Sequence, residues 1–135
     1  MPATAFKLEL TESSVMSDVE TAQTVLRHLH GQGIQIHIDD FGTGYSSLAR
    51  LQTLPVHAVK IDRSFLQQEN WQIANLISLL AKTLNLQSIA EGIETPEHLR
   101  TLRAIGCDYG QGYLLGRPLP ADQVEALLSE TPPGF

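Results

Sequence analysis

Two adjacent aspartates, Asp39 and Asp40, end a β-branched run in the stretch IQIHIDDFGTGYSS and stand just before Gly42 and Gly44. Neighbouring carboxylates repel each other unless a cation neutralises them. Oxygen ligands select hard ions, and Mg²⁺ and Mn²⁺ are the hard ions used in catalysis. A carboxylate pair can serve two such ions, an arrangement that recurs in phosphodiester cleavage. The pair therefore predicts a metal site, with a plain Asp-rich turn before glycine as the alternative.

Other charged residues also follow apolar runs whose pattern predicts strands. Side-chain alternation in IQIHI sends Ile36 toward one face and both His37 and Asp39 toward the other. If the strands are parallel, their carboxyl ends form one rim, where α/β folds place their active sites. Lys60 would add a positive charge for an attacking water or a phosphate oxygen, whereas we expect His37 to fill the interior. The charged residues expected on this rim with Asp39 and Asp40 are Glu9, Lys60, Asp62, Glu91 and Glu94.

The elements that position these residues follow from apolar periodicity, which switches repeatedly between two and about 3.6. It predicts strands at FKLEL, IQIHI, AVKI, QSIA and GYLLG, followed by helices within 17–33, 46–54, 71–84, 96–105 and 121–129. Ser17 and Glu20 have capping-box spacing, and Thr95 and Pro96 suit the start of the fourth helix. Parallel strands need crossover connections, so about five strand–helix units predict an α/β fold.

Length and composition limit the possible classes of protein. With 135 residues and a net charge of −6, we expect one domain and no sequence-independent binding to nucleic acid. The single cysteine, Cys107, excludes an internal disulfide and fits a reducing, cytoplasmic location. No apolar stretch reaches the ~20 residues of a membrane span, so we expect no membrane contact by this segment. Residues 130–135 are expected to fray.

Five strings, in this order, strongly resemble the EAL-domain family of bacterial cyclic di-GMP phosphodiesterases: LELTES, DDFGTGYSSL, LPVHAVKIDRSF, IAEGIET and GCDYGQGYLLGRPLP. The resemblance implies a TIM-like (β/α)₈ barrel in which two Mg²⁺ or Mn²⁺ ions support hydrolysis of cyclic di-GMP to linear pGpG. Residues 1–135 would form the C-terminal part, about five of eight units. The Glu-Ala-Leu signature and an Asn-bearing strand, which carry ligands of the first metal, are not among them. Sensory or GGDEF domains are expected upstream in a parent protein.

The resemblance also implies roles for individual residues. Glu9 and Asp39 match metal ligands, with Asp39 bridging, and Asp40 matches a ligand of the second ion. Glu91 resembles the metal-associated general base, and Lys60 the residue beside the attacking water.

Four further residues match supporting positions. Asp62, Glu94 and Gln111 match positions around the second metal and the substrate. Glu12 resembles the glutamate that orders the DDFGTGYSS loop, which also helps form the dimer in this family.

Three alternatives to an active cyclic di-GMP phosphodiesterase stay open. Without the upstream ligands, the chain is expected to be impaired or inactive by itself, because a two-metal mechanism needs both ions held in place. It would then be a non-catalytic module that binds cyclic di-GMP, or a dimerisation or interaction module. An unrelated magnesium phosphatase is disfavoured, because all five strings would have to match by chance. Unpaired sheet edges lead us to expect a homo-oligomer.

Overall fold

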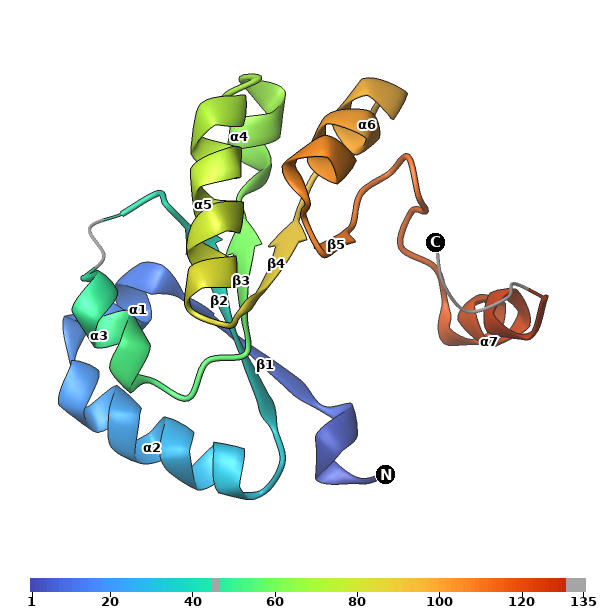
Figure 1. Ribbon diagram of the computed structural model, residues 1–135. Helices are drawn as coiled ribbons and strands as arrows, with labels where there is room; N and C mark the ends of the chain where they lie inside the picture. The colour runs from blue at the N-terminus through green and yellow to red at the C-terminus, as the bar shows by residue number, and fades with distance from the viewer. Residues whose placement is uncertain (45–46, 131–135) are drawn as a thin grey trace.

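A computed structural model describes residues 1–44 and 47–130 and shows a five-stranded parallel sheet with flanking helices (Figure 1). The strands lie in the sheet in their order along the chain: β1 (Lys7–Thr11), β2 (Gln35–Phe41), β3 (Ala58–Ile61), β4 (Gln87–Ala90) and β5 (Tyr109–Gly110). A 3₁₀ turn (Ala3–Ala5) precedes the α-helices α1 (Glu12–Ser17), α2 (Val19–Gly31), α3 (Leu48–Thr53), α4 (Arg63–Gln67), α5 (Trp71–Thr83), α6 (Pro96–Ile105) and α7 (Ala121–Glu130). The predicted α/β class with parallel strand–helix units is confirmed.

Side-chain caps set where several helices begin. The Thr95 hydroxyl caps α6 and Pro96 occupies its first turn, as predicted. The capping box expected of Ser17 and Glu20 is wrong, because the unpredicted helix α1 extends through Ser17. Asp18 caps α2 instead, and its carboxylate accepts from the Thr21 amide at 3.1 Å and from the Thr21 hydroxyl at 2.7 Å.

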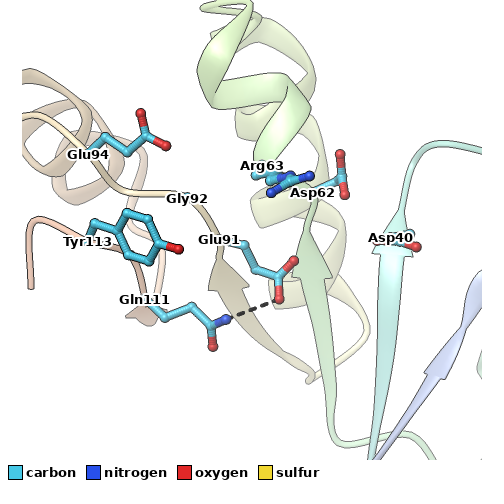
Figure 2. Close-up of a pocket in the computed structure, with 9 residues that line it drawn as sticks. Asp40, Asp62, Arg63, Glu91, Gly92, Glu94, Gln111 and Tyr113 are labelled. Atoms are coloured by element: carbon cyan, nitrogen blue, oxygen red, sulfur yellow. Dashed lines mark hydrogen bonds between the residues drawn. The ribbon is translucent and has the colours of Figure 1, made fainter. Parts of the chain in front are cut away.

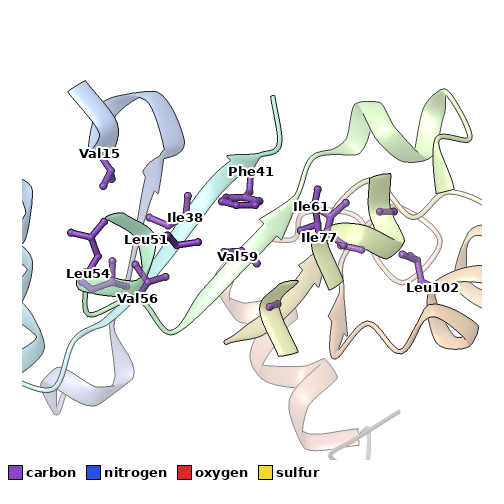
Figure 3. Close-up of a cluster of buried hydrophobic side chains, with 14 of the residues drawn as sticks. Val15, Ile38, Phe41, Leu51, Leu54, Val56, Val59, Ile61, Ile77 and Leu102 are labelled. Carbon is purple, nitrogen blue, oxygen red and sulfur yellow. The ribbon is translucent and has the colours of Figure 1, made fainter. Parts of the chain in front are cut away.

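The apolar core lies between one face of the sheet and the helices (Figure 3). Ile38 of β2 and Ile61 of β3 are fully buried there, and Leu51 of α3 and Ile77 of α5 belong to the same cluster. The opposite face of the sheet carries polar side chains, and His37 is 3% exposed on it. The alternation predicted for IQIHI is therefore confirmed, and so is the interior position of His37.

The strand expected at GYLLG is wrong, because strand pairing takes place a few residues earlier. β5 consists of Tyr109 and Gly110 alone, and the chain from Gly112 to Gly116 forms a turn. A Cβ on Gly112 would lie 2.2 Å from the backbone nitrogen and oxygen of Ile93. The chain thus crosses directly over the loop that follows β4, and only glycine permits so close an approach.

Helix α7 stands apart from the sheet (Figure 1) and has no buried residue. Its apolar side chains Val124, Leu127 and Leu128 are exposed. In the described part of the chain, β1 pairs only with β2 and β5 only with β4. Of the tail expected to fray, residues 131–135 lie outside the described residues, and Glu130 ends α7. Among the described residues, none of the helices has the length and apolarity that crossing a membrane requires.

Candidate metal-binding active site

The carboxyl ends of four neighbouring strands bring the expected polar residues to one rim of the sheet, and Figure 2 shows Asp40, Asp62 and Glu91 among them. Glu9 comes from β1, Asp39 and Asp40 from β2, Lys60 from β3, and Glu91 directly follows β4. Three of them form a tight group, since carboxylate oxygens of Asp39, Asp40 and Glu91 all lie within 4.8 Å of one another. The convergence predicted from a parallel sheet is observed for these residues.

A β-bulge explains how both aspartates reach the same side. The register between β2 and β3 shifts between Ile38 and Phe41, and Asp40 has a positive φ of 54°. Regular alternation would send Asp39 and Asp40 to opposite faces. Aspartate tolerates the left-handed conformation better than most residues, and the Asp39 carboxylate accepts from the Asp40 amide at 2.9 Å. The bulge therefore brings the carboxylates of two neighbouring residues to the same rim.

Lys60 is the buried cation of this rim. It is 3% exposed, and its Nζ lies 2.8 Å from Glu9 Oε1 and 2.5 Å from Glu91 Oε1. Burial acts to lower the pKa of Lys60, but its hydrogen bonds and charge interactions with Glu9 and Glu91 outweigh burial and raise it. The ammonium group therefore stays charged and ties the β1 and β4 sides of the rim together.

The Glu91 carboxylate has a second fixed partner. Gln111 Nε2 donates to Glu91 Oε1 at 3.2 Å, as Figure 2 shows. The Glu91 amide in turn donates to the Ile61 carbonyl at 3.1 Å, which fixes the backbone against β3. A carboxylate held by Lys60 and Gln111 is oriented before any ligand arrives.

Asp40 and Asp62 form a pair of carboxylates with opposite pKa shifts. Burial, hydrogen bonding to Asp62 and the charges of Asp39, Asp62 and Glu91 raise the pKa of Asp40. Burial acts to raise the pKa of Asp62 as well, but hydrogen bonds from Ser64, together with smaller effects, lower it. The Ser64 amide donates to Asp62 at 2.9 Å, because Asp62 caps α4. The charges of Asp62 and its neighbours add to the rise in the pKa of Asp40, and a bound cation would oppose that rise.

An open cleft of about 470 Å³ lies over this rim (Figure 2). Glu94, which was expected near the substrate, lines the cleft, although the hydrogen bond found for it is from its backbone amide to His98 Nδ1 at 3.4 Å. Two lining residues, Arg63 and Tyr113, were not singled out from the sequence. A cation following a strand looks like an ordinary surface residue, and Tyr113 was assigned to the strand that does not form. The lining consists of Asp40, Asp62, Arg63, Glu91, Gly92, Glu94, Gln111, Gly112 and Tyr113.

Glu12 lies beneath the loop that follows the aspartates. Its carboxylate is 2% exposed, and Oε2 accepts from the Gly42 amide at 3.1 Å. Burial raises the pKa of Glu12, and backbone hydrogen bonds from Gly42 and Gly44 oppose the rise. The Glu12 carboxylate thus fixes the backbone of this loop at Gly42. Tyr45 and Ser46, which belong to the same loop, lie outside the described residues.

The donor set fits hard divalent cations. Asp39, Asp40 and Glu91 offer carboxylate oxygens alone, and oxygen ligands suit Mg²⁺, Mn²⁺ and Ca²⁺ better than softer metals. Burial and hydrogen bonding to Asp62 raise the pKa of Asp40, and the charges of Asp39, Asp62 and Glu91 add to the rise, which a cation at this rim would oppose. Glu9 lies outside the three-residue group and engages Lys60 instead.

Several known proteins are similar to this chain in sequence and in architecture. The Pseudomonas aeruginosa protein described as bifunctional diguanylate cyclase/cyclic di-GMP phosphodiesterase MucR is 45% identical over 124 residues, which are 88% of this chain and 18% of that protein. A solved complex of the PaMucR phosphodiesterase with c-di-GMP has a TM-score of 0.89 and 43% identity, covering 92% of this chain and 52% of the other. Klebsiella pneumoniae BlrP1, solved with calcium and cy-diGMP, has a TM-score of 0.80 and 28% identity, covering 87% of this chain and 31% of the other.

This chain thus spans less than a fifth of full-length MucR and about half of the solved PaMucR chain. The match to the EAL domain extends over residues 1–118, which include every residue of the rim and cleft described above. The chain belongs to the EAL domain family.

Proposed function

We propose that this chain is the C-terminal part of an EAL domain whose chemistry is metal-dependent hydrolysis of cyclic di-GMP to linear pGpG. The observation that carries the proposal is the convergence of Asp39, Asp40 and Glu91 beside the buried Lys60 ammonium. The PaMucR and BlrP1 structures, whose descriptions name the cyclic dinucleotide, support it through their similarity to this chain.

Glu9, Asp39, Asp40 and Glu91 would hold the metal, as two Mg²⁺ or Mn²⁺ ions in a complete site, with Asp39 bridging. Bound divalent cations lower the pKa of an attacking water and neutralise phosphate charge. Asp62 and Glu94 would support the second ion and the substrate around it. The acidic rim would otherwise repel an anionic dinucleotide.

The chain's own residues would direct the proton and the phosphate. Glu91, oriented by Gln111 and Lys60, would take a proton from the attacking water. The water oxygen would form a bond to one phosphorus as the ester bond to the ribose 3′ oxygen breaks, and that oxygen would take a proton from solvent to become the 3′ hydroxyl of linear pGpG. Lys60 would place its positive charge beside that water.

The 135 residues by themselves would turn over cyclic di-GMP poorly or not at all. The family's upstream glutamate and asparagine ligands are not part of this sequence, so one ion would keep only Glu9 and Asp39 as protein ligands. The affinity for cyclic di-GMP should fall less than the turnover rate. A phosphate group can bind to an incomplete metal pair, whereas a two-metal displacement needs both ions.

Assembly and location complete the proposal. The unpaired edges of β1 and β5 and the exposed apolar side of α7 favour pairing with a second copy, so we place the chain in a homo-oligomer. In a complete protein, sensory or GGDEF domains would precede it. The free thiol of Cys107 fits a reducing cytoplasm.

The test compares turnover with equilibrium binding in the purified chain. Titration calorimetry with cyclic di-GMP should show binding that requires Mg²⁺, Mn²⁺ or Ca²⁺, while chromatography with Mn²⁺ should show little pGpG. Asp39→Asn should abolish metal-dependent binding, whereas Asp122→Asn, which makes the same charge change on exposed α7, should not. Absence of metal-dependent binding would refute the function. Turnover at the rate of a complete domain would refute the impairment, unless subunits were shown to complete each other's sites.

A further inference from the structure

The cleft contains one cation that the chemistry above does not use. Of the nine residues that line it, four are carboxylates and one, Arg63, is positively charged. Lys60 cannot serve a ligand in the same way, because Glu9 and Glu91 both engage its ammonium group. Arg63 is therefore the available positive charge at the mouth of an acidic cleft.

The Arg63 guanidinium does not neutralise a neighbouring carboxylate by direct pairing. Within residues 1–44 and 47–130, the ion pairs closer than 4 Å involve Lys60 and Arg100, and none involves Arg63. The charge of Arg63 does help to lower the pKa of Asp62, but it is one of the smaller causes. The side chain is exposed, so its five donors remain available to a ligand.

The backbone fixes where this side chain starts. Gly92 has a φ of +75°, and a Cβ there would lie 2.6 Å from Arg63 Cβ and 3.3 Å from Arg63 Cα. The loop after β4 thus packs directly against the first residue of α4. Figure 2 shows Arg63 beside Asp62, with Glu94 and Tyr113 on the other side of the cleft. This contact fixes the start of the Arg63 side chain at the edge of the cleft, which Arg63 lines.

We propose that Arg63 binds the second, non-reacting phosphodiester of the cyclic dinucleotide, an inference that rests on the proposed function. A cyclic dinucleotide carries two phosphodiesters, and only one can be opened at the metal rim. The other brings a negative charge into a cleft that already holds four carboxylates. Arginine matches phosphate through two parallel hydrogen bonds, and it is the one residue of the lining with that chemistry.

The experiment measures cyclic di-GMP affinity by titration calorimetry of the whole chain in Ca²⁺, with Ca²⁺ affinity measured separately. Arg63→Gln should weaken dinucleotide binding about tenfold and Arg63→Lys about threefold, because lysine keeps the charge and loses the paired geometry. Ca²⁺ affinity alone should stay equal or rise, since removing a cation beside carboxylates cannot weaken cation binding by charge. The affinity of Arg63→Gln for the dinucleotide should also fall less steeply with salt.

Arg27→Gln is the matched control, because it makes the same charge change on exposed α2, on a different part of the chain from the cleft. It should leave dinucleotide affinity unchanged. Unchanged dinucleotide affinity in Arg63→Gln would overturn the inference. A parallel loss of Ca²⁺ affinity would overturn it as well, because Arg63 would then act by organising Asp62. If the unsubstituted chain binds no dinucleotide in Ca²⁺, the proposed function fails, and the inference fails with it.

Discussion

Replacement of Lys60 by methionine tests the charge balance of the rim. At an effective dielectric constant of 20, each of its two pairs, at 2.8 Å and 2.5 Å, contributes about 6 kcal/mol before the cost of burying the charges. Breaking a buried pair by removing one partner costs about 3–5 kcal/mol. Glu91 is 17% exposed and Glu9 is 48% exposed, so water screens part of the charge that is left behind. We expect Lys60→Met to lower the free energy of unfolding by about 3 kcal/mol in metal-free buffer.

Saturating Mg²⁺ should remove most of this loss. In the substituted chain, Glu91 no longer pairs with an ammonium group and is free to bind the metal with Asp39 and Asp40. An ion that binds only the folded chain stabilises it in proportion to the logarithm of its affinity. Mg²⁺ should therefore stabilise the Lys60→Met chain more than the unsubstituted one. The difference between the free energies of unfolding of the two chains should then fall to about 1 kcal/mol.

Urea unfolding followed by circular dichroism, with chelator or with Mg²⁺, measures both quantities. Lys82→Met is the matched control, because Lys82 is exposed in the last turn of α5 and should contribute less than about 1 kcal/mol there. A cost for Lys60→Met no larger than that of Lys82→Met would refute the charge-balance reasoning. The reasoning would also be refuted if Mg²⁺ increased the difference in free energy of unfolding between the Lys60→Met chain and the unsubstituted chain.

Two further predictions concern Glu12 and the surface of α7. Because burial raises the folded-state pKa of Glu12, the free energy of unfolding should fall as pH rises from about 4.5 through that raised pKa. Glu12→Gln should reduce the fall between pH 5 and pH 7, which urea unfolding at both pH values measures. A steeper fall in the variant than in the unsubstituted chain would contradict the prediction. Sedimentation over a dilution series should show self-association that Leu128→Glu weakens and that Leu76→Glu, the same change at an exposed position of α5, does not. A chain that stays monomeric on concentrating would contradict the proposed assembly.

Local signals in the sequence were sufficient where local interactions decide the structure. The bounds of α6 follow from the Thr95 cap, Pro96 in the first turn and apolar spacing up to Gly106, whose φ of 83° ends the helix. The three central strands follow from apolar periodicity, because each of them buries side chains in the core. The common rim followed from parallel topology alone.

The features that could not be predicted depend on contacts between distant segments. GYLLG has the alternation of a strand, but the contact of Gly112 with Ile93 turns the chain there. Period-two alternation places Asp40 on the helical face, and only the register shift against β3 brings it to the rim. Nothing in the local sequence marks Arg63, since its position over the cleft depends on a loop that begins about thirty residues later.

The rim is arranged so that its carboxylates require positive charge in every state. Lys60 pairs with Glu9 and Glu91, while burial, hydrogen bonding to Asp62 and the nearby carboxylate charges raise the pKa of Asp40. A divalent cation would engage Asp39, Asp40 and Glu91, while Lys60 would stay beside Glu9 and Glu91. The same contacts therefore set both folding stability and metal affinity, and a change at Lys60 must alter the two together. This coupling is why the Mg²⁺ dependence of Lys60→Met stability reports on the site even if the chain itself turns over no substrate.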